Sequence, residues 1–424
     1  MRQSSFLIPI LLSALAWAEP SHAQSLPSCD SDNGGIEVPA GFCALVVADD
    51  LGPTRHMVSM PNGDLYVAVR NRREPGGIEA LRDTDGDGRF DVRERFGEEG
   101  GTSLRLHKGH LYLGRTNAIV RYRLTPGQLV PQGEAELLVT LPDQRSHAAK
   151  GIAFDGSGGM FVNVGAPANA CQFPDREEGV PGQDPCSLLE NHGGVWKFDD
   201  EKTGQSQATA PRYATGMRQN FAMDWHPSAG GLYLVQHGRD QLNTLWPEHF
   251  TVEQNAELPS EELLKVEEGS NFGWPYCHHD WQQGKRVLAP EYGGDGKKVG
   301  RCDQYPLPLI GFPGHWAPNG LLFYDGEQFP ERYRGGAFIV FHGSWNRAPL
   351  PQGGYNVVFV PFDGGHPATG EWEVFADGFA GDEPIVDRGA ATYRPSGVAI
   401  GHDGSLYISN DKTGRIWRVV HTGR

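Results

Sequence analysis

The sequence predicts an all-β protein built as a six-bladed β-propeller, and three observations carry this prediction. Glycine and proline are abundant, with 57 and 31 residues, and they separate many short runs of β-branched or aromatic residues. A glycine followed by an apolar run of strand length recurs six times along the chain. Segments with the apolar spacing of an amphipathic helix are scarce.

The six repeats are spaced as the blades of a propeller require. The steps between their glycines are 46, 50, 72, 105 and 68 residues, so the smaller steps fit one four-stranded blade and the larger ones a blade with inserted loops. The glycines that begin the repeats are Gly63, Gly109, Gly159, Gly231, Gly336 and Gly404.

A propeller must also close its ring. We expect the early segment 36–48 to pair into the same blade as the last strands, near Leu406 and within 416–420, because this pairing buries two strand edges. Residues 24–424 are therefore expected to form one propeller domain. The longest step between repeats predicts a long loop inserted at about 250–320 and stapled by cysteines.

The first 23 residues have the layout of a secretory signal peptide. Arg2 is followed by an apolar run of 12 residues, and a stretch of small residues ends at Ala23. A membrane anchor is the alternative, but this run is shorter than the ~20 residues that a spanning helix needs. We expect a periplasmic or secreted protein.

All six cysteines follow the expected cleavage point, and an even number in an oxidising compartment favours disulfides. Many pairings are open to six cysteines, and pairing of neighbours along the chain is the simplest. The neighbouring pairs are Cys29 with Cys43, Cys171 with Cys186, and Cys277 with Cys302.

The net charge of −16 argues against a general binder of nucleic acid or of anionic membranes, since both need a broad basic surface. An anionic ligand must then meet a local concentration of basic residues. The motifs for a zinc protease, a nucleophile elbow, a phosphate-binding loop and a dinucleotide fold are absent from the sequence.

Residues 83–94 (DTDGDGRFDVRE) resemble the 12-residue calcium loop. Carboxylates alternate along it, and Gly88 permits the sharp turn. The alternative is a solvated acidic hairpin, and a bound ion would have a structural role. The predicted ligands are Asp83, Asp85, Asp87, Asp91, Glu94 and the carbonyl of Arg89.

The inner strand of each blade begins near the end of the central channel where propellers bind ligands. Most of the residues just upstream of the six repeats are basic or carry an amide, although the protein is acidic overall. Each one alone would fit a surface or structural role. Together they predict a cationic cavity with an anionic ligand. These residues are Arg55, Thr102, His147, Arg218 with Gln219 and Asn220, His315 with Asn319, and Arg394.

Six segments resemble the soluble quinoprotein glucose, aldose and sorbosone dehydrogenases, which are six-bladed propellers, in the order of that family. These segments are 147–152 (HAAKGI), 216–220 (GMRQN), 236–240 (QHGRD), 271–275 (NFGWP), 342–347 (HGSWNR) and 393–398 (YRPSGV). The resemblance implies oxidation of a sugar at its anomeric carbon, with pyrroloquinoline quinone and Ca²⁺ as cofactors.

The same resemblance implies roles for individual residues. His147 matches the general base, and Arg218 matches the arginine that faces the quinone oxygens. The carbonyls of Gly238 and Arg239, with Asp240 beside them, match the calcium site at the cofactor. The remaining expected cofactor contacts are Arg55, Lys150, Gln219, Asn220, His315, Asn346, Arg347 and Arg394.

The chain departs from the glucose dehydrogenases at Gln219 and Asn346, and residues 344–347 resemble the sorbosone and pyranose dehydrogenase branch. Trp274, Trp316 and Trp345 offer rings that can stack on a quinone or a sugar, or pack between blades. The expected partners are a sugar and an electron acceptor such as a cytochrome, with the protein a monomer or homodimer. A calcium-dependent lactonase and a non-catalytic binding propeller remain the alternatives.

Overall fold

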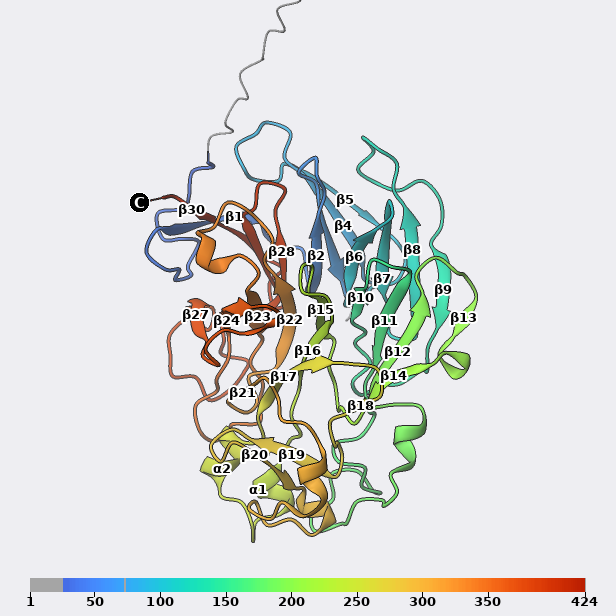
Figure 1. The fold of residues 1–424 in the computed structure, drawn as a ribbon. Helices are drawn as coiled ribbons and strands as arrows, with labels where there is room; N and C mark the ends of the chain where they lie inside the picture. Colours follow the sequence, from blue (N-terminus) through green and yellow to red (C-terminus); the bar gives the residue numbers. More distant parts are fainter. Residues whose placement is uncertain (1–25, 72–73, 424) are drawn as a thin grey trace, which may run out of the picture.

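The computed structural model describes residues 26–71 and 74–423, and its strands form six sheets of at least four strands arranged around a central channel (Figure 1). The prediction of a six-bladed all-β propeller is confirmed. The signal peptide predicted at 1–23 lies outside the described residues. No helix in the described part of the chain has both the length and the apolar character that crossing a membrane requires.

The first three blades follow one another along the chain. Blade 1 contains β2 (Thr54–Ser59), β3 (Leu65–Val69), β4 (Gly77–Arg82) and β5 (Val92–Phe96). Blade 2 contains β6 (Leu104–His107), β7 (His110–Gly114), β8 (Ala118–Arg123) and β9 (Glu136–Thr140), with β13 (Gln205–Ser206) added at its edge. Blade 3 contains β10 (Ile152–Phe154), β11 (Gly159–Val164), β12 (Gly194–Asp199) and β14 (Arg212–Thr215), with β18 (Ser270–Asn271) at its edge.

The other three blades complete the ring. Blade 4 contains β15 (Ala222–Trp225), β16 (Leu232–Gln236), β17 (Glu261–Val266) and β21 (Ile310–Phe312). Blade 5 contains β22 (Pro318–Phe323), β23 (Ala337–Phe341), β24 (Asn356–Val360) and β27 (Glu373–Ala376). Blade 6 contains β28 (Pro395–Ile400), β29 (Leu406–Asn410), β30 (Ile416–His421) and β1 (Phe42–Ala48).

Each of the six predicted repeats corresponds to the second strand of a blade. These strands, such as β23, are apolar along most of their length because both of their faces pack against neighbouring blades. The innermost strand of each blade contacts the innermost strands of the two neighbouring blades around the channel. These strands are β2, β6, β10, β15, β22 and β28. The core is therefore a series of apolar layers between blades rather than a single centre.

The ring closes as the sequence predicts, because β1 from the start of the chain pairs antiparallel with β30 from its end. Cys43 lies opposite Val420 in this pairing. All three disulfides join neighbouring cysteines, as expected: Cys29 with Cys43, Cys171 with Cys186, and Cys277 with Cys302.

Several long connections gather at one end of the propeller, the lower end in Figure 1. They include α1 (Leu242–Leu245), α2 (Val252–Glu257) and the pair β19 (Cys277–Asp280) and β20 (Lys285–Leu288). The stretch 250–320, expected as an inserted loop, contains α2, β19 and β20 together with the blade strands β17 and β21. A short ribbon of β25 (Phe362–Asp363) and β26 (His366–Pro367) extends from blade 5.

The closing blade provides a test of the fold. Trp417 on β30 is fully buried, and its indole N–H donates to the carbonyl of Gly34 at 3.0 Å. Trp417→Ala is expected to lower the free energy of unfolding by about 3–5 kcal/mol, because it leaves a large cavity in the blade where β1 pairs with β30. Urea unfolding measures this, with Trp281→Ala, at a side chain that is 37% exposed, as the control. An equal decrease in the free energy of unfolding in the two variants would contradict the buried position of Trp417 in the closing blade.

Candidate active site

A cavity of about 440 Å³ lies at the mouth of the central channel, and all six blades contribute to its wall. Five arginines and three histidines line it, while no aspartate or glutamate among the described residues does. The polar lining residues include Arg55, Arg70, Thr102, Arg145, His147, Gln219, His237, Asn319, His342, Arg388 and Arg394. On a protein with a net charge of −16, such a wall selects an anionic ligand.

The upstream positions singled out in the sequence account for part of this wall. Arg55, His147 and Gln219 are brought together with Thr102, Asn319 and Arg394 around one cavity. Residues that directly follow the second strand of a blade form another part, since the start of the first strand and the end of the second lie at the same side of an antiparallel pair. Arg70 follows β3, His237 follows β16 and His342 follows β23. Sequence reasoning did not select these three, although their position after each repeat was a usable signal.

His147 is held in the form that a general base needs. Its backbone is left-handed, with φ at +52°, and its Nδ1–H donates to the carbonyl of Ala166. This hydrogen bond leaves Nε2 as a proton acceptor. Burial, aided by the charge of Arg218, lowers the pKa of His147 to about 3, so the imidazole is neutral at pH 7.

The turn around His147 is fixed by its neighbours. The side-chain amide of Gln144 donates to the carbonyls of Ser146, His147 and Gly165 at 2.8 to 3.0 Å. A Cβ at Gly165 would lie 2.1 Å from the side-chain oxygen of Gln219 and 2.7 Å from the carbonyl of His147. Only glycine therefore permits the close approach of these two segments.

Arg218 lies behind the cavity wall in a buried ion-pair cluster. Its guanidinium donates to the carbonyl of Gly238 and to Asp240, at 2.7 Å in each case. Arg176 also pairs with Asp240 at 2.7 Å. Although burial opposes it, the charges of Arg218 and Arg176 hold the pKa of Asp240 below its usual range.

Glu261 fixes the backbone next to this cluster. Its carboxylate oxygens accept the N–H groups of Gly238 at 2.7 Å and Ala317 at 3.0 Å. Burial raises the pKa of Glu261 to about 8. The contact fixes the peptide between His237 and Gly238, next to the Gly238 carbonyl that is one of the two predicted ligands for calcium.

A second buried carboxylate, Asp411, organises the opposite wall. It lies 3.2 Å from both Arg55 and Arg70 and accepts the Nε2–H of His342 at 2.8 Å. The other ring nitrogen of His342 accepts from Arg394 at 2.9 Å. Asp411 was not predicted as a site residue, yet it contacts three of the basic groups in the wall.

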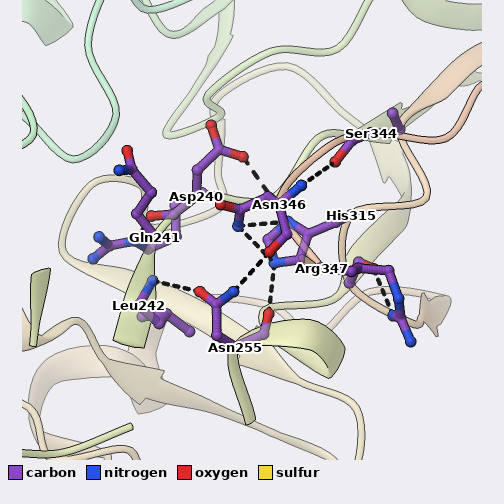
Figure 2. A network of polar contacts seen from close by, with 12 residues as sticks. Asp240, Gln241, Leu242, Asn255, His315, Ser344, Asn346 and Arg347 are labelled. Atoms are coloured by element: carbon purple, nitrogen blue, oxygen red, sulfur yellow. Dashed lines mark hydrogen bonds and ion pairs between the residues drawn. The ribbon is translucent and has the colours of Figure 1, made fainter. Parts of the chain in front are cut away.

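The other residues predicted to contact the cofactor lie outside the lining of the cavity. Lys150 is fully buried, and its Nζ donates to the carbonyl of Ala148 at 2.9 Å. The Asn220 amide points to the sulfur of Met217. Figure 2 shows His315 and Asn346 in a network of polar contacts with Asn255, and Arg347, on the same loop as Asn346, donates to Glu257.

The predicted calcium loop lies between β4 and β5, at the end of blade 1 remote from the cavity. Asp83, Asp85 and Asp91 bring one carboxylate oxygen each within 4.8 Å of one another. Asp83 also accepts the N–H groups of Gly86 and Gly88 at 2.7 and 2.8 Å. Asp87 accepts the N–H of Arg89 at 2.8 Å, and Glu94 lies on β5 opposite Ala80.

Comparison with known proteins agrees with this geometry. The model of the TrAA12-like family matches residues 36–422. The chain belongs to this family. The recognition of the chain as a relative of the soluble quinoprotein sugar dehydrogenases is thereby confirmed.

Individual relatives are distant in sequence but similar in fold. A pyrroloquinoline quinone-dependent pyranose dehydrogenase of Coprinopsis cinerea is 29% identical over 189 residues, which cover 38% of this chain. Alignments with curated relatives span 64% or less of those proteins' own lengths. A solved structure of the Trichoderma reesei Carbohydrate-Active Enzymes Family AA12 protein, 18% identical, has a TM-score of 0.74 and covers 91% of this chain and 98% of that one. The holo pyranose dehydrogenase PQQ domain from Coprinopsis cinerea, 17% identical, has a TM-score of 0.72 with coverage of 91% and 97%.

The buried histidines predict how stability depends on pH. Burial lowers the pKa to about 3 in His56, His147, His237 and His278, whereas an unfolded chain protonates histidine near 6.5. These neutral histidines contribute fully to the free energy of unfolding above pH 6.5. As the pH falls toward 3, the free energy of unfolding decreases by about 1.4 kcal/mol per pH unit for each histidine. Urea unfolding at pH 7.5, 6 and 5 measures the slope, and a midpoint independent of pH would contradict it.

Proposed function

We propose that this protein oxidises an aldose at its anomeric carbon, with pyrroloquinoline quinone bound in the cavity as the hydride acceptor. The cavity wall carries this proposal, because five arginines surround it and no described carboxylate does. The quinone is a flat tricarboxylate, and arginine is the side chain best suited to paired contacts with carboxylates. Membership of the TrAA12-like family and the name of the Coprinopsis relative support the same activity.

The donor set fits such a cofactor. Arg55 and Arg394 approach from blades 1 and 6, and Gln219 approaches from blade 4. Phe221 also lines the cavity, and its ring stacks against His56 and His237. The quinone, when bound, supplies the electrophilic carbon that accepts hydride from the sugar. The protein supplies the position of the sugar and a place for its proton.

His147 is the proposed base. Its Nε2 accepts the proton of the anomeric hydroxyl as hydride leaves the same carbon, so the sugar becomes the lactone. The ring is oriented by its hydrogen bond to the carbonyl of Ala166, and the imidazole is neutral at physiological pH, so Nε2 is unprotonated. Arg218 is the proposed source of positive charge beside the quinone oxygens.

The carbonyls of Gly238 and Arg239 are proposed to hold a calcium ion against the cofactor, where it would act as a Lewis acid. Carbonyl oxygens are ligands that calcium favours, and a bound ion would replace Arg218 as the partner of the Gly238 carbonyl, with Asp240 beside it. Glu261 holds the preceding peptide through the N–H of Gly238. A second, structural calcium is proposed in the loop 83–94, with Asp83, Asp85, Asp87, Asp91, Glu94 and the carbonyl of Arg89 as ligands.

We further propose that the protein is exported. Three disulfides fit an oxidising compartment, and the amino-terminal residues have the pattern of a signal peptide.

The electrons taken from the sugar would pass to a dye in the assay and to a cytochrome or similar acceptor in the cell.

Reconstitution tests the activity. Purified protein with the quinone and calcium is expected to show quinone absorbance that an aldose bleaches, together with reduction of a dye acceptor. His147→Gln is expected to lower kcat by about 10²-fold or more, because the proton then has no acceptor. His402→Gln, at an exposed histidine, is the matched control. Omission of calcium is expected to weaken the bleaching.

The alternatives give different outcomes in the same assay. A lactonase would hydrolyse a lactone with calcium alone and leave the dye oxidised. A binding propeller would give neither reaction. Either result, or full activity in His147→Gln, would contradict the proposal.

The affinity for the quinone tests the cationic wall separately. Arg394→Gln is expected to weaken binding about 10- to 100-fold, since a hydrogen bond to a charged group is worth roughly 1.5–3 kcal/mol. Arg332→Gln, which removes a guanidinium from an exposed ion pair with Glu373, is the control. Quinone titration by fluorescence quenching measures both, and equal affinities would argue against Arg394 as a contact.

A further inference from the structure

A hollow of about 430 Å³ adjoins the cavity, and its lining residues are Trp345, Ala348, Val386, Asp387 and Arg388. Trp345 and Arg388 also line the cavity, so the two spaces meet at these side chains. We propose that this side hollow binds a second sugar unit, so that the enzyme oxidises the reducing end of a disaccharide or longer saccharide in preference to a monosaccharide. The inference rests on the proposed function.

The loop 342–355 holds Trp345 outward although its neighbours are anchored. The carbonyl of Ser344 accepts from the Tyr355 hydroxyl at 3.3 Å. Asn346 is buried, with its amide 3.1 Å from the ring of His315 and its carbonyl accepting from Asn255 at 2.7 Å (Figure 2). Trp345 itself remains 43% exposed.

Arg347 secures the other side of the indole. Its guanidinium donates to Glu257 and to the carbonyl of Ala256, both at 2.5 Å, and to the carbonyl of Gly314 at 3.2 Å. An exposed aromatic ring on a loop tied at both sides is preorganised to bind a ligand at small entropic cost. This arrangement gives Asn346 and Arg347 a supporting role at the site.

The opposite wall of the hollow is tied to the same loop. Gln352 donates its backbone N–H to the carbonyl of Ile385 at 2.8 Å and its side-chain amide to the carbonyl of Val386 at 2.9 Å. These bonds connect the loop 342–355 with the segment that leads into β28. The two walls of the hollow are therefore joined in one structure.

The side chains of the hollow match the two surfaces of a sugar ring. Trp345 and Val386, which is 46% exposed, offer apolar contact for the C–H face. Asp387 can accept from hydroxyl groups and Arg388 can donate to them. Asp387 already accepts the N–H of Gly389 at 2.8 Å and keeps further acceptor capacity, which a wholly apolar ligand would not use, and Asp387 would repel an anion. A neutral polyhydroxylated ring satisfies all four side chains.

The experiment compares glucose with maltose and cellobiose as substrates of the reconstituted enzyme. The wild type is expected to have a higher kcat/KM for at least one disaccharide. Trp345→Ala is expected to raise the KM of that disaccharide about tenfold relative to that of glucose, and Trp345→Phe to restore part of the difference. Phe173→Ala serves as the control, since this aromatic ring is 82% exposed and lies outside the lining of both the cavity and the hollow.

A second measurement needs no catalysis. Saturation-transfer NMR of the same disaccharide with the protein alone is expected to show stronger transfer to the non-reducing ring, and Trp345→Ala is expected to abolish the difference. Equal effects of Trp345→Ala on glucose and disaccharide, or no preferential transfer, would overturn the subsite. Loss of oxidation of every aldose, with the transfer pattern intact, would instead overturn the proposed function alone.

Discussion

The site depends on one electrostatic constraint, which is the placement of many arginines around a single cavity in an acidic protein. Like charges in a poorly solvated space repel one another, so each group needs a counter-charge that does not occupy the cavity. Asp411 supplies it behind Arg55 and Arg70, and Asp240 pairs in the same way with Arg218, which lies behind the lining. Because both carboxylates lie outside the lining, the wall itself remains a set of donors.

The blades were predictable from sequence because their signal is local. A glycine followed by an apolar run specifies a turn and a strand buried on both faces, and every repeat became the second strand of a blade. Position relative to these strands also placed His147, Arg55 and Arg394 at the cavity. The periodicity therefore predicts which residues lie near the channel mouth without any knowledge of the loops.

The direction of side chains on the loops was less predictable, since it depends on contacts between distant segments. Arg347 turns away from the cavity because Glu257, 90 residues earlier, accepts its guanidinium. Asn346 points to His315 for a similar reason. Asp411 was missed because a carboxylate next to an anion site is unexpected until its arginine partners are seen in three dimensions.

Ring closure and the site are physically coupled at the seam between blades 6 and 1. Thr54 on β2 donates its hydroxyl to the carbonyl of Asn410 at 2.6 Å, and Ser409 donates to the carbonyl of Arg55 at 2.8 Å. The ion pair of Arg55 with Asp411 crosses the same seam. An open ring would separate these groups and leave the arginines without their counter-charge. The strand that β1 adds at the edge of blade 6 thus stabilises the cationic wall as well as the fold, because both require the two ends of the chain to meet.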